Sequence, residues 1–274
     1  MQKVVLITGA TDGIGLATAQ LYFKAGFKVL LHGRSSDKLA AAVGTLTADN
    51  PGGDAALIET YQADLSDFSQ LDQMIADINR QQTRIDVLIN NAGVFKIPQP
   101  IAENGLDLRF VVNILAPIRL TQGLSGLFSN ETRVINLSSA AQAPVELAAL
   151  NGQKQLADDF EAYAQSKLAL TVWTRYMADQ HPEGPVFIAV NPGSLLASKM
   201  VKQGFGVEGK DLSIGAKILL QAGVDAGFAS VSGLYFDNDV GQFSRPHPAA
   251  ENQQACSELL AELNRVLTQY YPKP

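Results

Sequence analysis

The chain has 274 residues, of which 46% are hydrophobic, enough to build the core of one large α/β domain spanning residues 1–274. Its net charge of −6 argues against a nucleic-acid or anionic-membrane partner, because either would need a basic face. No apolar run reaches the roughly 18 residues of a membrane span, and the single cysteine, Cys256, excludes an internal disulfide, so we expect a cytoplasmic protein. The three histidines lack metal-ligand spacing, which predicts no metal site.

In chain order, short apolar runs alternate with segments of helical periodicity. The predicted strands are 3–8, 27–33, 55–62, 85–90, 133–139, 185–191 and 232–236. The predicted helices are 14–25, 35–49, 67–81, 104–128 (interrupted by Pro117), 161–180 and 249–270. This alternation with short connections predicts a parallel sheet of about seven strands with helices on both faces. Residues 140–160 depart from it as a loop-like insertion.

Ligands of such sheets bind beyond the carboxyl ends of the strands, so the residues after each strand are the candidates for a site. The first strand is followed by "TGATDGIG", with Gly9, Gly13 and Gly15 before the start of a helix. Close backbone approach and the helix dipole favour a phosphate there. An ordinary tight turn is one alternative. A P-loop is another, but no Lys-Ser/Thr pair follows Gly15, so dinucleotide binding is the better interpretation.

The residues after the second and third strands bear on the cofactor. An NAD site calls for a carboxylate after the second strand, but Arg34 stands there, and its planar guanidinium suits a 2′-phosphate. A solvated surface arginine is the alternative. Asp64, after the third strand, could accept a hydrogen bond from an adenine amino group or could cap the next helix beside Ser66. The sequence leaves both interpretations open.

Polar residues and glycines also follow the remaining central strands. "NNAG" (90–93) suits backbone contact with a ribose, and Ser138 and Ser139 end the fifth strand. "NPG" (191–193) forms a rigid turn that could press on a planar ring. These residues should meet at one edge of the sheet.

Tyr163 and Lys167 lie four positions apart in a predicted helix, so their side chains share one face. A phenol titrates near pH 10 and needs about 4 kcal/mol of preference for the phenolate to titrate near pH 7. A lysine cation at about 4 Å supplies about that much at an effective dielectric of about 20. The pair therefore predicts a tyrosine whose pKa is lowered by lysine for proton transfer, with a surface pair as the alternative.

Taken together, "TGATDGIG", "NNAG", Asn113, "NLSS", "YAQSK" and "NPG" resemble, in this order, the short-chain dehydrogenase/reductase family over about residues 3–240. The resemblance implies a Rossmann-type doubly wound fold and hydride transfer between a nicotinamide cofactor and a carbonyl or secondary alcohol. NADP(H) is the expected cofactor and NAD(H) the second choice. Asp12, where many NADP-specific relatives carry a basic residue, makes the expected preference moderate.

The resemblance also implies roles for particular residues. Tyr163 would be the general acid/base, Lys167 would lower its pKa and reach the ribose, Ser139 would orient the substrate oxygen, and Asn113 would hold a water that relays protons to Lys167. The implied cofactor contacts are Gly9, Thr11, Asp12, Gly13, Ile14, Gly15, Arg34, Asp64, Leu65, Asn91, Ala92, Gly93, Tyr163, Lys167, Pro192 and Gly193.

Two features depart from the family pattern. The long spacing from Ser139 to Tyr163 is similar to that of retinol-dehydrogenase-like and carbonyl-reductase-like members, and Ser198 stands where the family usually has a threonine. We expect a small lipophilic carbonyl or alcohol as substrate, because the predicted walls are mostly apolar. These walls are Val94 and Phe95, the insertion residues Val145, Leu147 and Leu150, and a lid at 194–212 with glycines 204, 206 and 209 around Phe205.

A homo-oligomer, a dimer or a tetramer, is expected. Two other functions were considered on the same fold. A cofactor-binding regulatory or redox-sensing protein is disfavoured because the catalytic set is intact. A sugar-nucleotide epimerase or dehydratase is disfavoured because only about 80 residues follow "NPG".

Overall fold

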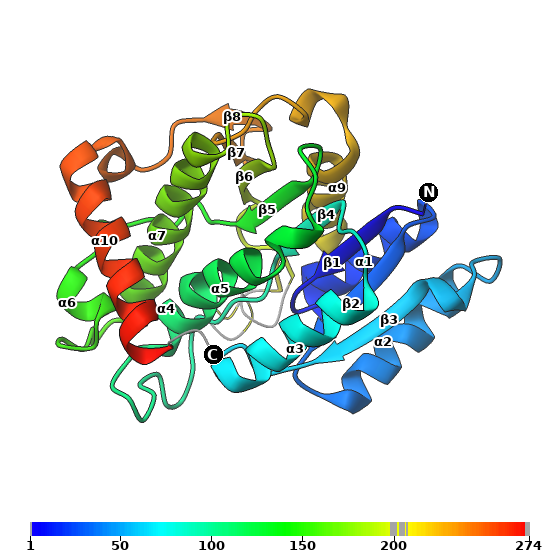
Figure 1. Cartoon of the computed structure of the whole chain (residues 1–274), viewed down its shortest axis with the longest axis horizontal. Helices are drawn as coiled ribbons and strands as arrows, with labels where there is room; N and C mark the ends of the chain where they lie inside the picture. Colours follow the sequence, from blue (N-terminus) through cyan, green and yellow to red (C-terminus); the bar gives the residue numbers. More distant parts are fainter. Residues whose placement is uncertain (1, 198–201, 203–205, 207, 272–274) are drawn as a thin grey trace.

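A computed structural model describes residues 2–197, 202, 206 and 208–271. Within these residues, eight strands form one sheet in the order β3-β2-β1-β4-β5-β6-β7-β8 (Figure 1). Every neighbouring pair is parallel except β7 and β8, which are antiparallel. The strand order reverses between β1 and β4, so the sheet is doubly wound and the predicted Rossmann-type α/β fold is confirmed.

The elements follow the predicted alternation along the chain. The strands are β1 (Val4–Ile7), β2 (Lys28–Gly33), β3 (Ile58–Gln62), β4 (Val87–Asn90), β5 (Arg133–Leu137), β6 (Val186–Asn191), β7 (Tyr235–Asp237) and β8 (Gln242–Ser244). The helices are α1 (Gly13–Lys24), α2 (Ser36–Asp49), α3 (Phe68–Gln81), α4 (Leu108–Phe110), α5 (Ala116–Gly123), α6 (Leu147–Leu150), α7 (Asp159–Gln180), α9 (Leu212–Val224) and α10 (Gln253–Tyr270).

Two apolar layers sandwich the sheet because successive residues of a strand point to opposite faces. In β1, Leu6 packs in the layer covered by α3, α5, α7 and α10, whereas Ile7 packs in the layer covered by α1, α2 and α9. Both side chains are fully buried, as are their counterparts in β2, Leu30 and Leu31. This coverage explains why the central strands are continuous apolar runs rather than alternating ones.

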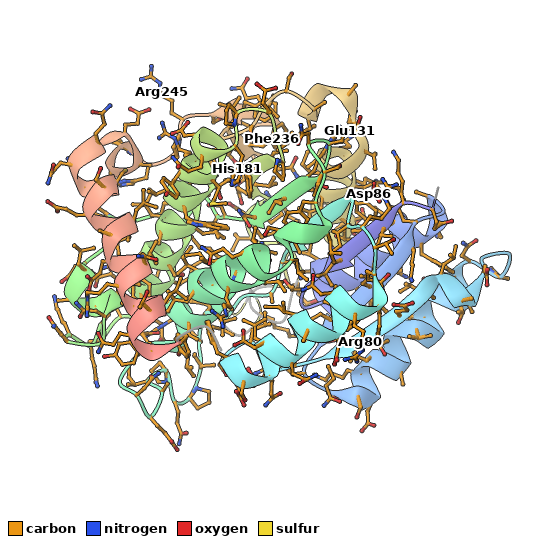
Figure 2. All side chains as sticks on the ribbon, viewed as in Figure 1. Arg80, Asp86, Glu131, His181, Phe236 and Arg245 are labelled. Carbon is orange, nitrogen blue, oxygen red and sulfur yellow. The ribbon has the colours of Figure 1, made fainter. Side chains whose placement is uncertain are left out.

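The described sheet has eight strands, against the prediction of about seven, because β8 was not predicted from the sequence. With only Gln242–Ser244, this strand is too short to show a periodicity. It is recognisable by its packing, since the ring of Phe243 lies 5.1 Å from that of Phe236 on β7 (Figure 2 labels Phe236). A tertiary contact, rather than a local pattern, defines this edge of the sheet.

The helix predicted over 104–128 is divided. A short α4 leads into a π-helical turn, Val111–Leu115, and α5 then begins with Pro117 in its first turn. The third strand also starts later than predicted, at Ile58, because residues 55–57 form a 3₁₀ turn capped by Asp54. The predicted helix at 249–270 is a 3₁₀ turn followed by α10.

The insertion at 140–160 contains α6 and packs against the C-terminal helix. Leu150 is fully buried in the core, and the Asn151 side chain donates to Glu262 of α10 at 2.6 Å. At the other end of α10, the Tyr271 ring stacks on Phe68 with centroids 3.6 Å apart. Helix α10 thus fastens the insertion to the domain.

Candidate active site

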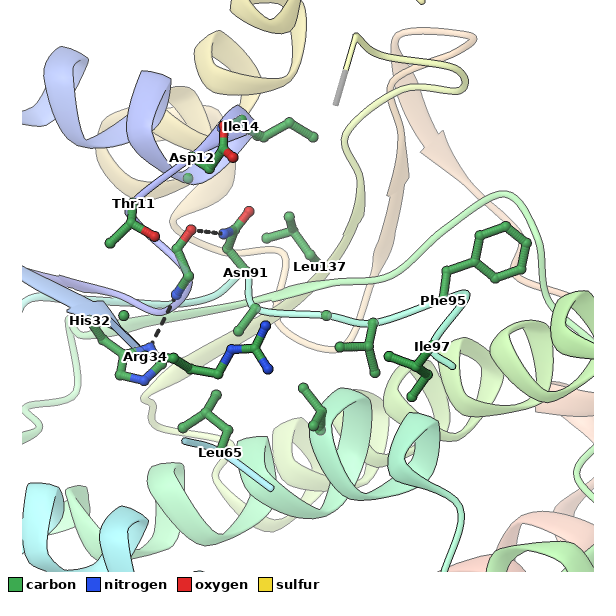
Figure 3. A pocket seen from close by; sticks show the side chains of 18 of the residues that line it. Thr11, Asp12, Ile14, His32, Arg34, Leu65, Asn91, Phe95, Ile97 and Leu137 are labelled. Carbon is green, nitrogen blue, oxygen red and sulfur yellow. Dashed lines mark hydrogen bonds between the residues drawn. The ribbon is translucent and has the colours of Figure 1, made fainter. Parts of the chain in front are cut away.

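A cleft of about 810 Å³ opens at the carboxyl ends of the central strands (Figure 3). Nearly all of the residues predicted to contact a cofactor line it: Gly9, Thr11, Asp12, Gly13, Ile14, Gly15, Arg34, Asp64, Leu65, Asn91, Ala92, Gly93, Tyr163, Lys167 and Pro192. Three predicted site residues, Asn113, Ser139 and Gly193, are not among the lining residues and lie around it. The topology therefore brings the strand-end motifs to one place.

The glycine-rich loop is packed so closely that side chains could not replace its glycines. Gly9 and Gly13 have φ of +65° and +55°, which glycine adopts without steric cost. A Cβ on Gly15 would lie 2.3 Å from the Gly9 carbonyl oxygen and 2.5 Å from Asn91 Nδ2. Asn91 Nδ2 in turn donates to the carbonyls of Thr8 at 2.7 Å and Gly9 at 3.1 Å. The loop and "NNAG" thus form one backbone-lined cradle.

Asp12 caps helix α1 within this cradle. Its Oδ1 accepts from the backbone N–H of Gly13 at 2.8 Å. This carboxylate places a negative charge at the N-terminus of α1, where a phosphate would otherwise be favoured most. The sequence predicted only a moderate preference for NADP(H) because of this carboxylate.

His32 lines the cleft. The sequence pattern did not predict this position, because the histidines were assessed only as possible metal ligands. Its Nδ1 accepts from the backbone N–H of Gly9 at 3.1 Å, a contact drawn in Figure 3, and its Nε2 lies 3.0 Å from the Ala63 carbonyl oxygen. Burial, helped by the nearby charge of Arg34, lowers its pKa to about 4 despite Ala63 and Asp64. The imidazole is therefore neutral at pH 7 and ties the glycine loop to the end of β3.

Positive side chains gather where β2 ends. Arg34 is 70% exposed, and its guanidinium lies 3.8 Å from the Asp64 carboxylate. Lys38 lines the same end of the cleft and was not identified from the sequence. Ser35 caps α2, since its side chain accepts from Lys38 N at 3.4 Å. One turn of α2 thus presents a second cation beside Arg34.

Asp64 takes part in a turn of its own. Its Oδ1 accepts from the Ser66 backbone N–H at 2.9 Å and from the Ser66 hydroxyl at 2.6 Å. The cap of α3 is Asp67, whose carboxylate accepts from the N–H groups of Ser69 and Gln70. The interpretation of Asp64 as the cap of that helix is therefore wrong.

Tyr163 and Lys167 project from α7 toward the end of β5. Lys167 Nζ lies 5.5 Å from the Tyr163 ring centroid and donates to the Leu137 carbonyl oxygen at 2.6 Å. Burial lowers the pKa of Lys167 to about 8, so the amine is still mostly protonated at pH 7. Burial raises the pKa of Tyr163, and its hydrogen bond with the Ser139 side chain offsets this only in part. Burial thus moves the Tyr163 pKa in the direction opposite to the lowering by Lys167 that the sequence predicted.

The two serines after β5 have different surroundings. Ser138 is buried, with its hydroxyl 2.6 Å from the Thr171 hydroxyl of α7, so it joins the helix to the sheet. Ser139 Oγ accepts from Ala141 N at 3.1 Å and is the serine hydrogen-bonded to Tyr163. The second serine is thus the one beside the phenol.

Asn113 lies in the π-helical turn, behind the cleft wall. Its Oδ1 accepts from Val94 N at 2.8 Å, and its Nδ2 donates to Val94 O at 3.0 Å and to Ser166 Oγ at 2.9 Å. A Cβ built on Gly93 would lie 3.3 Å from Asn113 Oδ1 and 3.5 Å from Lys167 Nζ. Asn113 therefore fixes the segment after "NNAG" against α7.

The buried guanidinium of Arg109 fixes α4, the short helix that leads into the π-helical turn. Arg109 is 1% exposed and forms paired hydrogen bonds with Asp107, at 2.9 and 2.6 Å, and an ion pair with Asp159 at the start of α7. The guanidinium thus links the segment that carries Asn113 to the helix that carries Tyr163 and Lys167.

The walls beyond Gly93 are mainly apolar. Val94, Phe95, Ile97 and Pro98 line the cleft, with Lys96 as the polar exception, and the Phe95 ring lies 5.2 Å from that of Tyr163. The predicted wall from the insertion is not seen among the lining residues. Val145, Leu147 and Leu150 belong to or pack against the core instead, because α10 draws the insertion away from the cleft.

Parts of the predicted lid cannot be placed. Ser198, Gly204 and Phe205 lie outside the described residues. Gly206 and Gly209 are described, with φ of +68° and +81°, and a Cβ on Gly209 would lie 2.6 Å from Ala197 Cα.

Among the described residues, no helix is long and apolar enough to cross a bilayer, and no group of three or more His, Cys, Asp and Glu side chains could hold a metal ion.

Comparison with known proteins shows the family to which the chain belongs. Residues 3–205 match the family model described as short chain dehydrogenase. The chain is 29% identical to retinol dehydrogenase 13 of Homo sapiens, over 97% of this chain and 84% of that protein. It is 31% identical to retinol dehydrogenase 12 of Bos taurus, over 86% of this chain and 78% of that protein.

Two solved structures extend the likeness of fold. A structure of an uncharacterised protein from Mycobacterium paratuberculosis has a TM-score of 0.77 at 25% identity, covering 97% of this chain and 93% of its own. RhlG of Pseudomonas aeruginosa, solved as an active-site complex with NADP, has a TM-score of 0.68 at 22% identity, covering 86% of this chain and 94% of its own.

Proposed function

Because this chain belongs to the short-chain dehydrogenase family, we propose that it is an NAD(P)(H)-dependent oxidoreductase that interconverts a carbonyl and a secondary alcohol. The observation that carries this proposal is the cluster of Tyr163, Ser139 and Lys167 beside the glycine cradle. The clustered groups can hold a substrate oxygen and move a proton, and the cradle can hold a dinucleotide.

The cleft fits the cofactor. A Cβ on Gly9 would lie 3.0 Å from Ala92 Cα and one on Gly15 would lie 2.3 Å from the Gly9 carbonyl oxygen, so these glycines let the loop pack closely where the backbone N–H groups at the start of α1 can bind a phosphate. Asn91, Ala92 and Gly93 line the cleft beside this loop, where Asn91 Nδ2 donates to the Gly9 carbonyl at 3.1 Å. The nicotinamide, when bound, supplies or accepts the hydride, and the protein supplies orientation and the proton.

Tyr163 is the general acid in this proposal. Its raised pKa keeps the phenol protonated at neutral pH, which suits donation of a proton to a carbonyl oxygen. Ser139, already hydrogen-bonded to the phenol, would hold that oxygen in line.

A proton must return to Tyr163 after each turnover, and Lys167 is the nearby group with a suitable pKa. We propose that the main-chain carbonyl of Asn113 accepts a hydrogen bond from a water that relays protons to Lys167. Pro117 has no N–H, so that carbonyl lacks the donor that an α-helix would place four residues later. The relay itself stays a prediction.

The first prediction separates proton transfer from binding. Tyr163→Phe should lower kcat by about 10²–10⁴-fold while cofactor affinity stays within about twofold, because only the acidic hydroxyl is lost. Tyr176→Phe is the matched control, since Tyr176 lies on the same helix but is 40% exposed. Steady-state kinetics with NADPH and fluorescence titration give the two quantities. A Tyr163→Phe protein that keeps more than about a hundredth of the wild-type rate would contradict the role of Tyr163.

We propose a lipophilic substrate, because Val94, Phe95, Ile97 and Pro98 line the wall beyond Gly93. The names of curated relatives, which include retinol and polyprenol dehydrogenases, support an apolar alcohol or its carbonyl. The wild-type assay is a panel of retinoid, prenyl and aromatic aldehydes and ketones against small charged keto acids. Turnover of the keto acids alone would contradict the proposal.

We also propose a moderate preference for NADP(H), carried by Arg34 with Lys38 beside it. A charge-assisted contact with a 2′-phosphate contributes about 1.5–3 kcal/mol, or about ten- to a hundredfold in affinity. Asp64, 3.8 Å from Arg34, competes for the same guanidinium and reduces this gain.

The second prediction tests that preference. Wild-type kcat/KM should be about ten- to a hundredfold higher with NADPH than with NADH, and Arg34→Asp should bring the ratio to one or below. Arg80→Asp is the control, because Arg80 on α3 is similarly exposed, 67% against 70%, and also pairs with a carboxylate. A ratio unmoved by Arg34→Asp would mean that Arg34 is only a solvated surface residue.

A cytoplasmic location and a dimeric or tetrameric state of the protein stay predictions.

A further inference from the structure

The turn between β7 and β8 (residues 237–241) grips the "NPG" turn that borders the cleft. Asn238 N donates to Asn191 O at 3.1 Å, and Asn238 Nδ2 donates to Pro192 O at 2.9 Å. Asn191, which is 2% exposed, donates through Nδ2 to Asp237 Oδ1 at 2.8 Å and to Asp239 Oδ2 at 2.9 Å. Three consecutive residues of one turn thus bind two consecutive residues of the other.

Asp239 extends this grip to the next residue. Its Oδ1 accepts from the Ser194 backbone N–H at 2.8 Å, and its Oδ2 also accepts from the Ser194 hydroxyl. Burial acts to raise the pKa of Asp239, but the hydrogen bonds from Ser194 and Asn191, with the charge of Lys210, bring its pKa below the ordinary value. The carboxylate is therefore ionised at neutral pH and joins β6, the turn and the hairpin.

Leu195, the residue after Ser194, has a backbone conformation that is unfavourable for a leucine. Leu195 has φ of +56°, the one positive φ outside glycine among the described residues. A leucine takes this conformation only where its surroundings enforce it. Its other side is held too, since Lys210 N donates to Leu195 O at 2.7 Å and Ala197 N donates to Lys210 O at 2.7 Å.

The same β7–β8 hairpin also contacts Ser139, a residue of the proposed catalytic set. The hydroxyl of Tyr235 on β7, which is 5% exposed, donates to the main-chain oxygen of Ser139 at 3.1 Å. Pro192, held by Asn238, lines the cleft, and Ser139 bonds the Tyr163 phenol. One hairpin therefore supports two cleft segments that come from different strands.

We propose that Asp239 is a positioning residue that holds residues 191–195, and with them the Pro192 side of the cleft, in the geometry that turnover requires. This inference rests on the proposed oxidoreductase function. Asp239 touches neither reacting atoms nor the phenol. It acts through Ser194, Asn191 and the enforced backbone of Leu195.

The third prediction uses Asp239→Ala, which removes both acceptors. We expect kcat/KM to fall at least tenfold and the Ser194 amide to exchange hydrogen at least tenfold faster, with the cofactor dissociation constant rising because Pro192 is a proposed cofactor contact, and with the fold retained. Asp239→Asn, which keeps one acceptor, should lie between wild type and Asp239→Ala. Asp179→Ala, which removes an exposed carboxylate of α7, is the control for charge.

A double-mutant cycle with Ser194→Ala tests the contact itself. Ser194→Ala should lower kcat/KM by a smaller factor and should have no further effect in the Asp239→Ala protein. If Asp239→Ala does not fold, Ser194→Ala with amide exchange carries the same test. Exchange and kinetics equal to those of Asp179→Ala would overturn the inference. Absence of wild-type turnover on every substrate would instead count against the proposed function, while amide exchange at Ser194 would still decide the role of Asp239.

Discussion

His32 illustrates how a single side chain can shape the cleft without touching a substrate. A backbone N–H can only donate, so the bond from Gly9 N requires a lone pair on Nδ1 and puts the proton on Nε2, which then donates to Ala63 O. The buried ring thus has one tautomer, and both of its nitrogens are used. Protonation would replace the Nδ1 lone pair by a second donor facing Gly9 N.

The fourth prediction follows from this bond. The pKa of His32 is about 4 in the folded protein against 6.5 ordinarily, so between these values the unfolded chain binds more protons. Stability should therefore fall as the pH drops from about 6.5 toward 4, by up to about 3 kcal/mol at 1.36 kcal/mol per pKa unit.

Urea unfolding of wild type and His32→Gln at matched pH values isolates the His32 contribution from that of the carboxylates. The wild type should lose more stability than His32→Gln over this range. Identical pH dependence in the two proteins would show that His32 titrates normally.

At the scale of elements, two helical glycines have opposite reasons for being glycine. Gly15 in α1 has no room for a methyl group, because the Gly9 carbonyl oxygen would lie 2.3 Å from it. Gly44 in α2 is exposed and has nothing within 4 Å of an added Cβ. The first glycine is required by the approach of the loop, and the second only weakens its helix.

The fifth prediction compares them. Gly44→Ala should stabilise the protein by about 0.5–1 kcal/mol, because alanine loses less backbone entropy in a helix. Gly15→Ala should destabilise it and weaken NADPH binding at least tenfold, since the loop must move. Urea midpoints and a cofactor titration measure both effects. Equal effects of the two substitutions would contradict the close packing of the glycine loop.

The π-helical turn at Val111–Leu115 is an element that tertiary contacts require. Asn113 bonds Val94 on one side and Ser166 on the other, so its side chain must face both the "NNAG" segment and α7. Arg109 fixes the approach to this turn through Asp107 and Asp159. Pro117 marked a break in the predicted helix, but these distant partners determine that the break is a π turn at Asn113.

Across the whole molecule, the C-terminal elements contact three earlier segments of the chain: the insertion, Ser139 and the "NPG" turn. Helix α10 packs on the layer that contains α5 and α7 and draws the insertion onto the core through Asn151 and Glu262 (Figure 1). The β7–β8 hairpin supports Ser139 and the "NPG" turn. The family match covers residues 3–205, so these supporting elements lie largely beyond it.

The sequence alone was sufficient for the alternation of strands and helices, the doubly wound sheet and the strand-end motifs. These depend on local periodicity, on glycine, and on the rule that parallel strands end at one edge. It also predicted seventeen of the residues that line the cleft, fifteen as cofactor contacts and Val94 and Phe95 as part of its wall. Tertiary structure decided β8, the π turn, the place of the insertion and the roles of His32, Lys38 and Asp239, because each depends on partners distant in the chain. It likewise decided the pKa values of Tyr163 and Lys167, since burial is produced by packing and not by the four-residue spacing of the pair.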